Sequence, residues 1–212
     1  MKIFNKIIFL ILFTFLSCKE SIIDPPHPIS SPAKNVVINE LFRIDSTKYY
    51  SHWWIEIYNP TNNDVSISNW KIKFINSNLE ISLSDQKTTS VINKGSFIVI
   101  TNNKNIFDDF WNIAPLTILL DFSKIFPIIK DSDEVQLIDN ENKIISIFRF
   151  GNYKCSGKDP FPNNQSFGSV EEWHSICRYA DPFGAFDTGN SKNDFFEETN
   201  PIAGYYSQRM KY

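Results

Sequence analysis

The feature that most constrains the fold is a succession of short apolar runs that begins at Val36 and continues to Phe150. Asn, Asp, Ser and Gly residues separate these runs, and the 3.6-residue period of an amphipathic helix is nearly absent. Many short strands joined by regular turns are typical of a β-sandwich. The predicted strands are Val36–Phe42, Trp53–Tyr58, Val65–Ile67, Lys71–Phe74, Leu79–Leu83, Ser96–Thr101, Glu134–Ile138 and Ile144–Phe150.

Four segments interrupt this pattern. Residues 105–111 predict a short helix, and the apolar residues 116–130 are expected to cover one end of the core. Residues 152–168 contain several Gly and Pro with little periodicity, and Asp187–Thr199 is polar, so both are predicted to be long loops. The sequence therefore predicts an all-β domain whose C-terminal part is rich in loops.

The N-terminus carries two lysines and then an apolar run, Ile7–Leu16. This run is shorter than the roughly 20 apolar residues that span a bilayer, and it has the length of a secretory signal core. With Ser17 and Cys18 it resembles the signal peptide and lipobox of a bacterial lipoprotein, whose cysteine is lipidated after cleavage. An ordinary cleaved signal peptide that happens to contain a cysteine is the alternative.

The lipoprotein resemblance implies a signal peptide over 1–17 and a lipid on Cys18. Residues 18–34 include four prolines and read as an extended tether. We expect the chain to be held by its lipid in the bacterial cell envelope, at the outer membrane, on the periplasmic face or the cell surface. The membrane is then one partner, because two or more acyl chains anchor a protein stably.

The composition excludes some functions. The formal net charge is −3 and no Lys/Arg cluster occurs, so we expect no nucleic-acid partner. No nucleotide-binding, serine-hydrolase or zinc-protease motif is present, so we expect no cofactor and no enzymatic activity.

Two cysteines remain if Cys18 carries lipid. In an oxidising envelope Cys155 and Cys177 predict a disulfide, which would tie down the C-terminal loops. Two free thiols are the alternative. His174 and Cys177 have metal-ligand spacing, but two ligands do not make a zinc site, so no metal is expected.

Several segments, in the right order, resemble the lamin tail domain family. They include an opening strand, a second strand with Asn-Pro, a segment ending in Trp, a hairpin entry and an Arg-x-x-Asp region near the C-terminus. Asn69 stands where the family usually has Gly. The segments are Val36–Leu41, Trp54–Pro60, Val65–Ile72, Asn93–Ile100, Asp131–Leu137, Phe150–Gly151 and Arg178–Asp181.

This resemblance implies an immunoglobulin-like β-sandwich over residues 35–204, followed by a C-terminal tail over 205–212. It also implies a binding or attachment module whose protein or glycan partner is unknown. The signature residues, structural or binding, are Asn39, Glu40, Trp54, Glu56, Asn59, Trp70, Gly151 and Arg178.

Strand alternation places Ile55 and Ile57 in the core and Trp54, Glu56 and Tyr58 on the other face. A carboxylate between two aromatic rings could bind a sugar or a cation. The alternative is that Glu56 pairs with Arg178 or caps a neighbouring backbone. Trp70, Phe74 and Phe97 are expected in the core.

Three other readings are possible. Asp131, Asp133 and Glu134 could bind calcium, although turn chemistry also explains three acids there. A carbohydrate-binding or adhesion function would use exposed Trp53, Trp54 and Tyr58, with Tyr49 and Tyr50 also expected to be exposed. An unrecognised hydrolase would use His174, Glu172 and Asp181.

Overall fold

The computed structural model describes residues 30–44, 51–85, 90–114, 117–122, 129–182, 184–205 and 209–211. The expected signal peptide, Cys18 and the tether before residue 30 lie outside this range, as do Tyr49 and Tyr50. Within it, no helix is long and apolar enough to cross a membrane.

The described chain is mostly β-strand, with two short α-helices and one 3-10 turn. The elements are β1 (Val37–Ile44), β2 (His52–Tyr58), β3 (Val65–Ser66), β4 (Lys71–Phe74), β5 (Leu79–Ser82), η1 (Leu83–Asp85), β6 (Val91–Ile92), β7 (Phe97–Thr101), α1 (Lys104–Phe110), β8 (Ile118–Asp121), β9 (Asp133–Ile138), β10 (Ile144–Phe150), β11 (Ser175–Arg178), β12 (Ala180–Asp181), β13 (Gly184–Ala185), α2 (Ser191–Asp194) and β14 (Phe195–Glu198).

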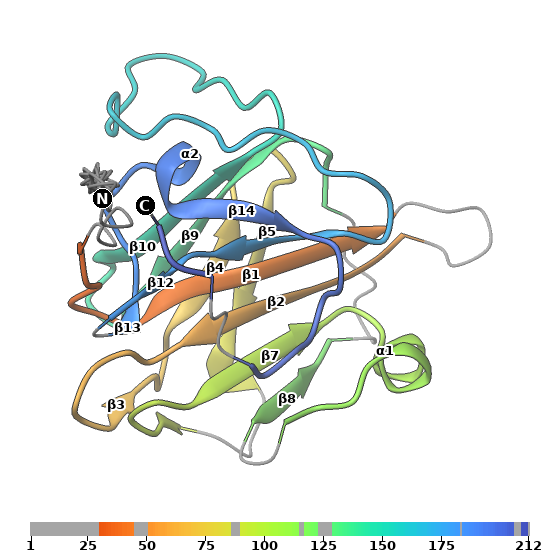
Figure 1. The fold of residues 1–212 in the computed structure, drawn as a ribbon. Coiled ribbons are helices and arrows are strands. Elements are labelled where there is room, and N and C mark those ends of the chain that lie inside the picture. Colours follow the sequence, from red (N-terminus) through yellow and green to blue (C-terminus); the bar gives the residue numbers. More distant parts are fainter. Residues whose placement is uncertain are drawn as a thin grey trace, which may run out of the picture.

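Two sheets form the body of the molecule (Figure 1). The larger sheet has the order β14-β11-β1-β2-β7-β8, and the smaller one has the order β10-β9-β4-β5. Every pairing in them is antiparallel except that of β7 with β8, which is parallel. The prediction of an all-β, immunoglobulin-like sandwich is confirmed.

The main core lies between the sheets and is apolar. Alternate residues of β2, namely Trp53, Ile55 and Ile57, face it from the larger sheet, and Ile72 and Phe74 face it from β4. Trp70 and Phe97 are also buried, as predicted together with Phe74. Alternation therefore identifies the inner face correctly because the strand period is two.

The opposite face of the larger sheet is covered as well. A second cluster there joins Phe42, Trp54 and Val99 to Phe107 of α1 and to Ala203. In Figure 1 the chain after β14 runs back across this sheet. The sheet therefore has an inner face and a covered outer face, and the outer one carries the signature residues Glu40, Trp54 and Glu56.

The predicted loop Asp187–Thr199 is wrong, because it contains α2 and the edge strand β14. Residues 175–178 form β11, a strand that the sequence did not predict. Both strands are short. β11 pairs with β1 and β14 pairs with β11, and these long-range pairings supply the order that the local pattern lacks. Residues 118–121 also join the sheet as β8 rather than only capping the core.

The last residues of the expected tether contact the domain. Pro32 forms a β-bridge with Phe186, and Ala33 N–H donates to the carbonyl of Ala185 over 2.8 Å. Ser31 N–H donates to Asp181 Oδ2 over 2.6 Å. The chain therefore reaches the sandwich beside β12 and β13.

Candidate functional site

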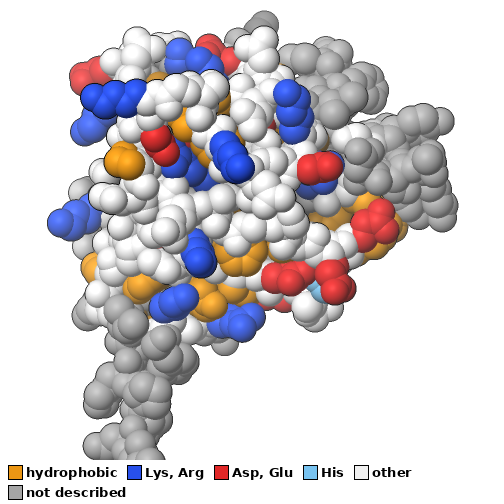
Figure 2. All heavy atoms as spheres, turned by 90° about the horizontal axis from the view of Figure 1, so that it is seen from above, with side chains coloured by type: hydrophobic (Ala, Val, Ile, Leu, Met, Phe, Trp, Pro, Cys, Tyr) orange, Lys and Arg blue, Asp and Glu red, His pale blue; other side chains and the backbone are white. Residues whose placement is uncertain are grey.

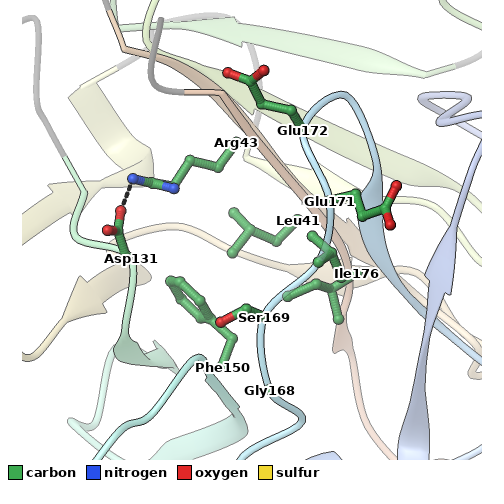
Figure 3. Close-up of a pocket in the computed structure, with 10 residues that line it drawn as sticks. Leu41, Arg43, Asp131, Phe150, Gly168, Ser169, Glu171, Glu172 and Ile176 are labelled. Carbon is green, nitrogen blue, oxygen red and sulfur yellow. Dashed lines mark hydrogen bonds and ion pairs between the residues drawn. The ribbon is translucent and has the colours of Figure 1, made fainter.

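An open pocket of about 450 Å³ lies between the two sheets at one end of the sandwich (Figure 3). Its floor is apolar: Leu41 of β1, Phe150 of β10 and Ile176 of β11 are all buried and line it. Residues 168–172, from the loop before β11, form one wall. Because the floor belongs to three strands of two sheets, the packing of the sandwich fixes its shape.

The rim of the pocket is polar. Arg43 pairs with the 84% exposed side chain of Asp131, and its Nε donates to the carbonyl of Ile129. Exposed Glu171 and Glu172 also line the pocket. The rim thus carries three carboxylates and one guanidinium, so it is acidic overall. An apolar floor with an acidic rim suits an apolar side chain that has a cationic neighbour.

Acidic side chains also gather beside a histidine on the face shown in Figure 2. His174 Nδ1 lies 2.8 Å from Glu197 Oε1, which also accepts the backbone N–H of Glu171. Asp181 instead accepts a hydrogen bond from the Ser31 N–H, and Glu172 lines the pocket. His174 thus takes its carboxylate partner from β14, not from the two acids that the hydrolase reading requires.

The outer face of the larger sheet buries two carboxyl groups side by side. Glu40 of β1 and Glu56 of β2 are paired in register, and both are buried. Asn39 Nδ2 donates to Glu56 Oε1 over 2.6 Å, and the Gly204 N–H donates to the other oxygen. Ser175 Oγ donates to Glu40. Glu56 therefore caps a backbone, which is one of the two alternatives expected for it.

Burial governs the protonation of this pair. It raises the pKa of Glu56 to about 8, against the lowering effect of the hydrogen bonds from Gly204 and Asn39. It also raises the pKa of Glu40 well above its usual value, and the neighbouring charge of Glu56 adds to this shift. A pair sealed from solvent and held by the fold is a structural group rather than a binding site.

Gly204 is required where the C-terminal segment crosses Glu56. Its φ is +82°, and a Cβ there would meet Thr117 Oγ1 and lie 3.1 Å from Ala114 Cβ. Only glycine combines this backbone conformation with so close an approach. The segment can therefore bring its N–H to the buried carboxyl group.

Comparison with known families agrees with this sandwich: the Lamin Tail Domain matches residues 29–152, more than half of the chain. The chain belongs to the lamin tail domain family. A search of the curated proteins returns no match. The matched range ends just after β10, so β11 and β14, which complete the larger sheet of this lamin tail domain, lie beyond it.

Two further signature residues of the lamin tail domain, Asn59 and Trp70, lie at turns. Asn59 Nδ2 donates to the carbonyls of Asn63 and Ile92, closing the turn after β2. Asn69 has φ +63°, the left-handed conformation for which the family usually has Gly, and it precedes buried Trp70.

Gly151 shapes the wall of the pocket. It has φ +63°, and a Cβ there would meet the carbonyl oxygen of Asp131 and lie 2.8 Å from Ser132 Cα. Its N–H donates to the carbonyl of Gly168 over 2.7 Å. This turn therefore brings the end of β10 against the acidic segment that carries Asp131.

Arg178, at the end of β11, connects this strand to β1 and to the segment after β13. Its Nε donates to the carbonyl of Ile38 over 2.9 Å, and its Nη1 donates to the carbonyl of Phe186 over 2.8 Å. The guanidinium carbon lies 4.3 Å from the ring centre of Phe195 and also faces Asp187. Arg178 is almost fully buried, so its role is structural.

Asp131, just before β9, and Asp133 and Glu134, at its start, serve separate partners. Asp133 accepts hydrogen bonds from the backbone N–H groups of Asn76 and Ser77, at 2.7 and 2.9 Å. Asp131 pairs with arginine at the pocket, and Glu134 binds a second arginine. This division of partners is the turn chemistry that was the alternative to calcium binding.

A buried arginine that the sequence analysis missed organises the long loop after β10. Arg149 pairs with Glu134 at 2.7 Å and holds both oxygens of Asp159. Its Nη1 also donates to the carbonyls of Phe161 and Asn164. The only available sequence signal was a charged residue, Arg149, within an apolar strand. An acid, Asp159, follows in the long loop after that strand.

The predicted disulfide is wrong, because Cys155 and Cys177 are both free. Cys177 is buried in β11, where it faces Glu40 on the covered sheet, whereas Cys155 lies in the loop after β10. Burial raises the pKa of the Cys177 thiol well above its usual value. The contacts of Arg149 anchor this loop, whereas the disulfide was expected to anchor it.

The expected exposed aromatic surface is also wrong. Trp53 and Trp54 are both 0% exposed: the first is in the main core and the second stacks on Phe42 at 5.8 Å. Tyr58 is half-buried and stacks on Phe97 at 4.5 Å. The two tryptophan rings are therefore closed to a glycan.

Proposed function

We propose that this lamin tail domain is a lipid-anchored, non-catalytic binding module of the bacterial cell envelope. The anchor would be the lipidated Cys18, and the tether that follows it would present the sandwich away from the membrane. The pocket between the sheets is the proposed contact site for a protein partner.

The observation that carries this proposal is the pocket itself. Its floor of Leu41, Phe150 and Ile176 is apolar, while its rim offers Glu171 and Glu172. A fixed concave site with an apolar floor and a few polar groups at its rim favours binding. A partner segment would insert an aliphatic side chain and set a lysine or arginine against the acids.

Capture from envelope extract tests the site. Ser169 is exposed and lines the pocket, so Ser169→Trp should fill it without disturbing the core. The matched control is Ser156→Trp, an exposed serine in the same connection between β10 and β11 that does not line the pocket. We expect a protein retained by immobilised full-length chain and by the Ser156 variant, and lost with Ser169→Trp. Equal retention by all three proteins would disprove the pocket as the contact site.

The anchor is tested separately. In a bacterial host that processes lipoproteins, Cys18→Ser should move the chain from the membrane fraction to the aqueous phase of a detergent partition. Mass spectrometry of the unsubstituted chain should show acyl groups on Cys18. An unmodified Cys18 would overturn the anchor and leave the pocket proposal standing.

A further inference from the structure

The free side of β10 is only partly closed by the protein's own chain. Next to Phe150, the carbonyl of Arg149 accepts the N–H of Phe167 over 3.0 Å, and the N–H of Gly151 donates to Gly168. The N–H of Arg149 donates to Ser191 Oγ over 2.9 Å. One end of this sheet edge is therefore extended by the loop before β11.

The pairing stops before Ile147. Backbone groups of residues two apart in a strand point to the same side, so the N–H and C=O of Ile147 face the same edge as those of Arg149. In the register, Ile147 lies opposite Gln136 of β9. Among the described residues, none donates to or accepts from these two backbone groups.

A groove of about 200 Å³ runs along this open edge. Ile144, Ile145 and Ile147 line it and are only partly buried. The bulge between Ile144 and Ser146 marks the far end of the open stretch. Edge strands of soluble proteins usually carry Lys or Pro that discourage pairing, and residues 144–148 have neither.

The walls of the groove are fixed. Phe161 and Asn164 stand on one side, and Asn164 Oδ1 accepts both the N–H and the hydroxyl of Ser191 at 2.8 Å. Asp187 and Gly189 stand on another side, and the N–H of Asp187 donates to the carbonyl of Ser31 over 2.7 Å. The groove is therefore preformed.

We propose that this groove binds an extended segment of a partner protein, which pairs with β10 at Ile147 as an added strand. An unpaired N–H and C=O on one strand edge match the backbone of another strand. The half-buried isoleucines and Phe161 favour an apolar or β-branched side chain in the segment. A second copy that paired through its own β10 would also bring the residues that wall its own groove against this one. A single extended segment has no such walls, so it fits the groove better.

The site is separate from the pocket between the sheets, and its test is separate too. Full-length protein in detergent is screened against a displayed library of random linear peptides. Enriched peptides should protect the Ile147 amide from hydrogen exchange. Ile147→Pro should weaken their binding about tenfold or more, because it removes the donor of a ladder hydrogen bond. Ile147→Val, which keeps the N–H, is the matched control, and Ser169→Trp should leave binding unchanged.

Each other outcome overturns the proposal. No enriched peptide, or peptides that leave the Ile147 amide unprotected, would exclude strand addition. A concentration-dependent dimer that protects this amide would make a second copy the occupant. If Ile147→Pro does not fold, as judged by its unfolding curve, the hydrogen-exchange result on the unsubstituted protein decides alone.

Discussion

The two faces of the larger sheet bury side chains to the same extent but by different means. On β2, Trp53, Ile55 and Ile57 face the other sheet and pack into the main apolar core. His52, Trp54 and Glu56 face the opposite way, and they are buried just as completely beneath α1 and the C-terminal segment. The inner face is mainly apolar, whereas the outer face also encloses carboxyl and imidazole groups that water would otherwise solvate.

This difference has an energetic consequence. Buried polar groups without partners reduce stability by about 1–3 kcal/mol each. The outer face contains several such atoms: Asn39 Oδ1, both ring nitrogens of His52 and Trp54 Nε1. Substitutions that remove polarity should therefore be tolerated or stabilising on the outer face, and substitutions that remove volume should be most costly on the inner face.

The largest effect should come from the inner face. Trp53→Ala should lower the free energy of unfolding by about 3–5 kcal/mol, because it removes a large buried ring that packs 5.6 Å from Phe74. Urea unfolding measures the loss. Trp173→Ala, at a residue 37% exposed, is the control and should lose far less. Similar losses in both variants would contradict the distinction.

The second effect concerns the buried carboxyl pair. Glu56 titrates near 4.5 when unfolded and at about 8 when folded, so the folded state binds more protons between these values. Stability from this group is complete below pH 4.5 and is lost as the pH rises to about 8. One proton corresponds to a slope of about 1.4 kcal/mol per pH unit. Glu40, whose pKa is also raised, acts in the same direction.

Glu56→Gln should remove this proton's share of the slope and raise stability most at pH 8. The Gln oxygen can accept the Gly204 N–H, and a turned Asn39 amide would give its unpaired oxygen a donor. Unfolding curves at pH 5 and pH 8 test this, with Glu80→Gln on the exposed part of β5 as control. A variant as pH-dependent as the original would show that Glu56 is ionised in the fold.

The third effect is at His52, which lies at the start of β2 on the same outer face as Trp54 and Glu56. Burial lowers its pKa to about 4 from an unfolded value of 6.5. Stability from neutral His52 is therefore complete above pH 6.5 and is lost as the pH falls to about 4. His52→Phe should stabilise the protein by about 1 kcal/mol at neutral pH and more at pH 4.5, because it removes two unpaired nitrogens.

The control for His52 is His174→Phe, since His174 keeps a partner in Glu197. Between about pH 4.5 and 6.5 the slopes from Glu56 and His52 oppose each other, so His52→Phe should expose the falling limb due to the carboxyl pair. Thermal unfolding across this range measures it. A histidine variant that lost stability throughout would indicate a hydrogen-bonded role for the imidazole.

The same comparison explains what could be predicted from the sequence. Alternation along β2 separates Ile55 and Ile57 from Trp54 and Glu56, because that pattern is local. Whether the second face is open to solvent depends on Phe107 and Ala203, which are distant in sequence, so Trp54 was expected at the surface. The pocket likewise needs residues from β1, β10 and the loop before β11.

The predictions for the cysteines and the C-terminal loops were wrong for a related reason. The disulfide was inferred from an even count and a compartment, but Cys177 faces the covered sheet at Glu40. The loop is held instead by Arg149 and Asp159, which lie close in sequence but have no recognisable spacing. Charge pairs of this kind depend on the path of the loop, and a local pattern does not contain that path.

The smallest effect should be Trp54→Phe, and it tests the outer face directly. The smaller ring loses a few tens of Å³ of packing, which costs about 1 kcal/mol. The change also removes Trp54 Nε1, a buried donor without a partner, and this gain is of similar size. The stack on Phe42 is kept, so stability should change by less than about 1 kcal/mol. Trp53→Phe, on the inner face, should lose more, and equal losses would mean that the outer face tolerates no more than the inner one.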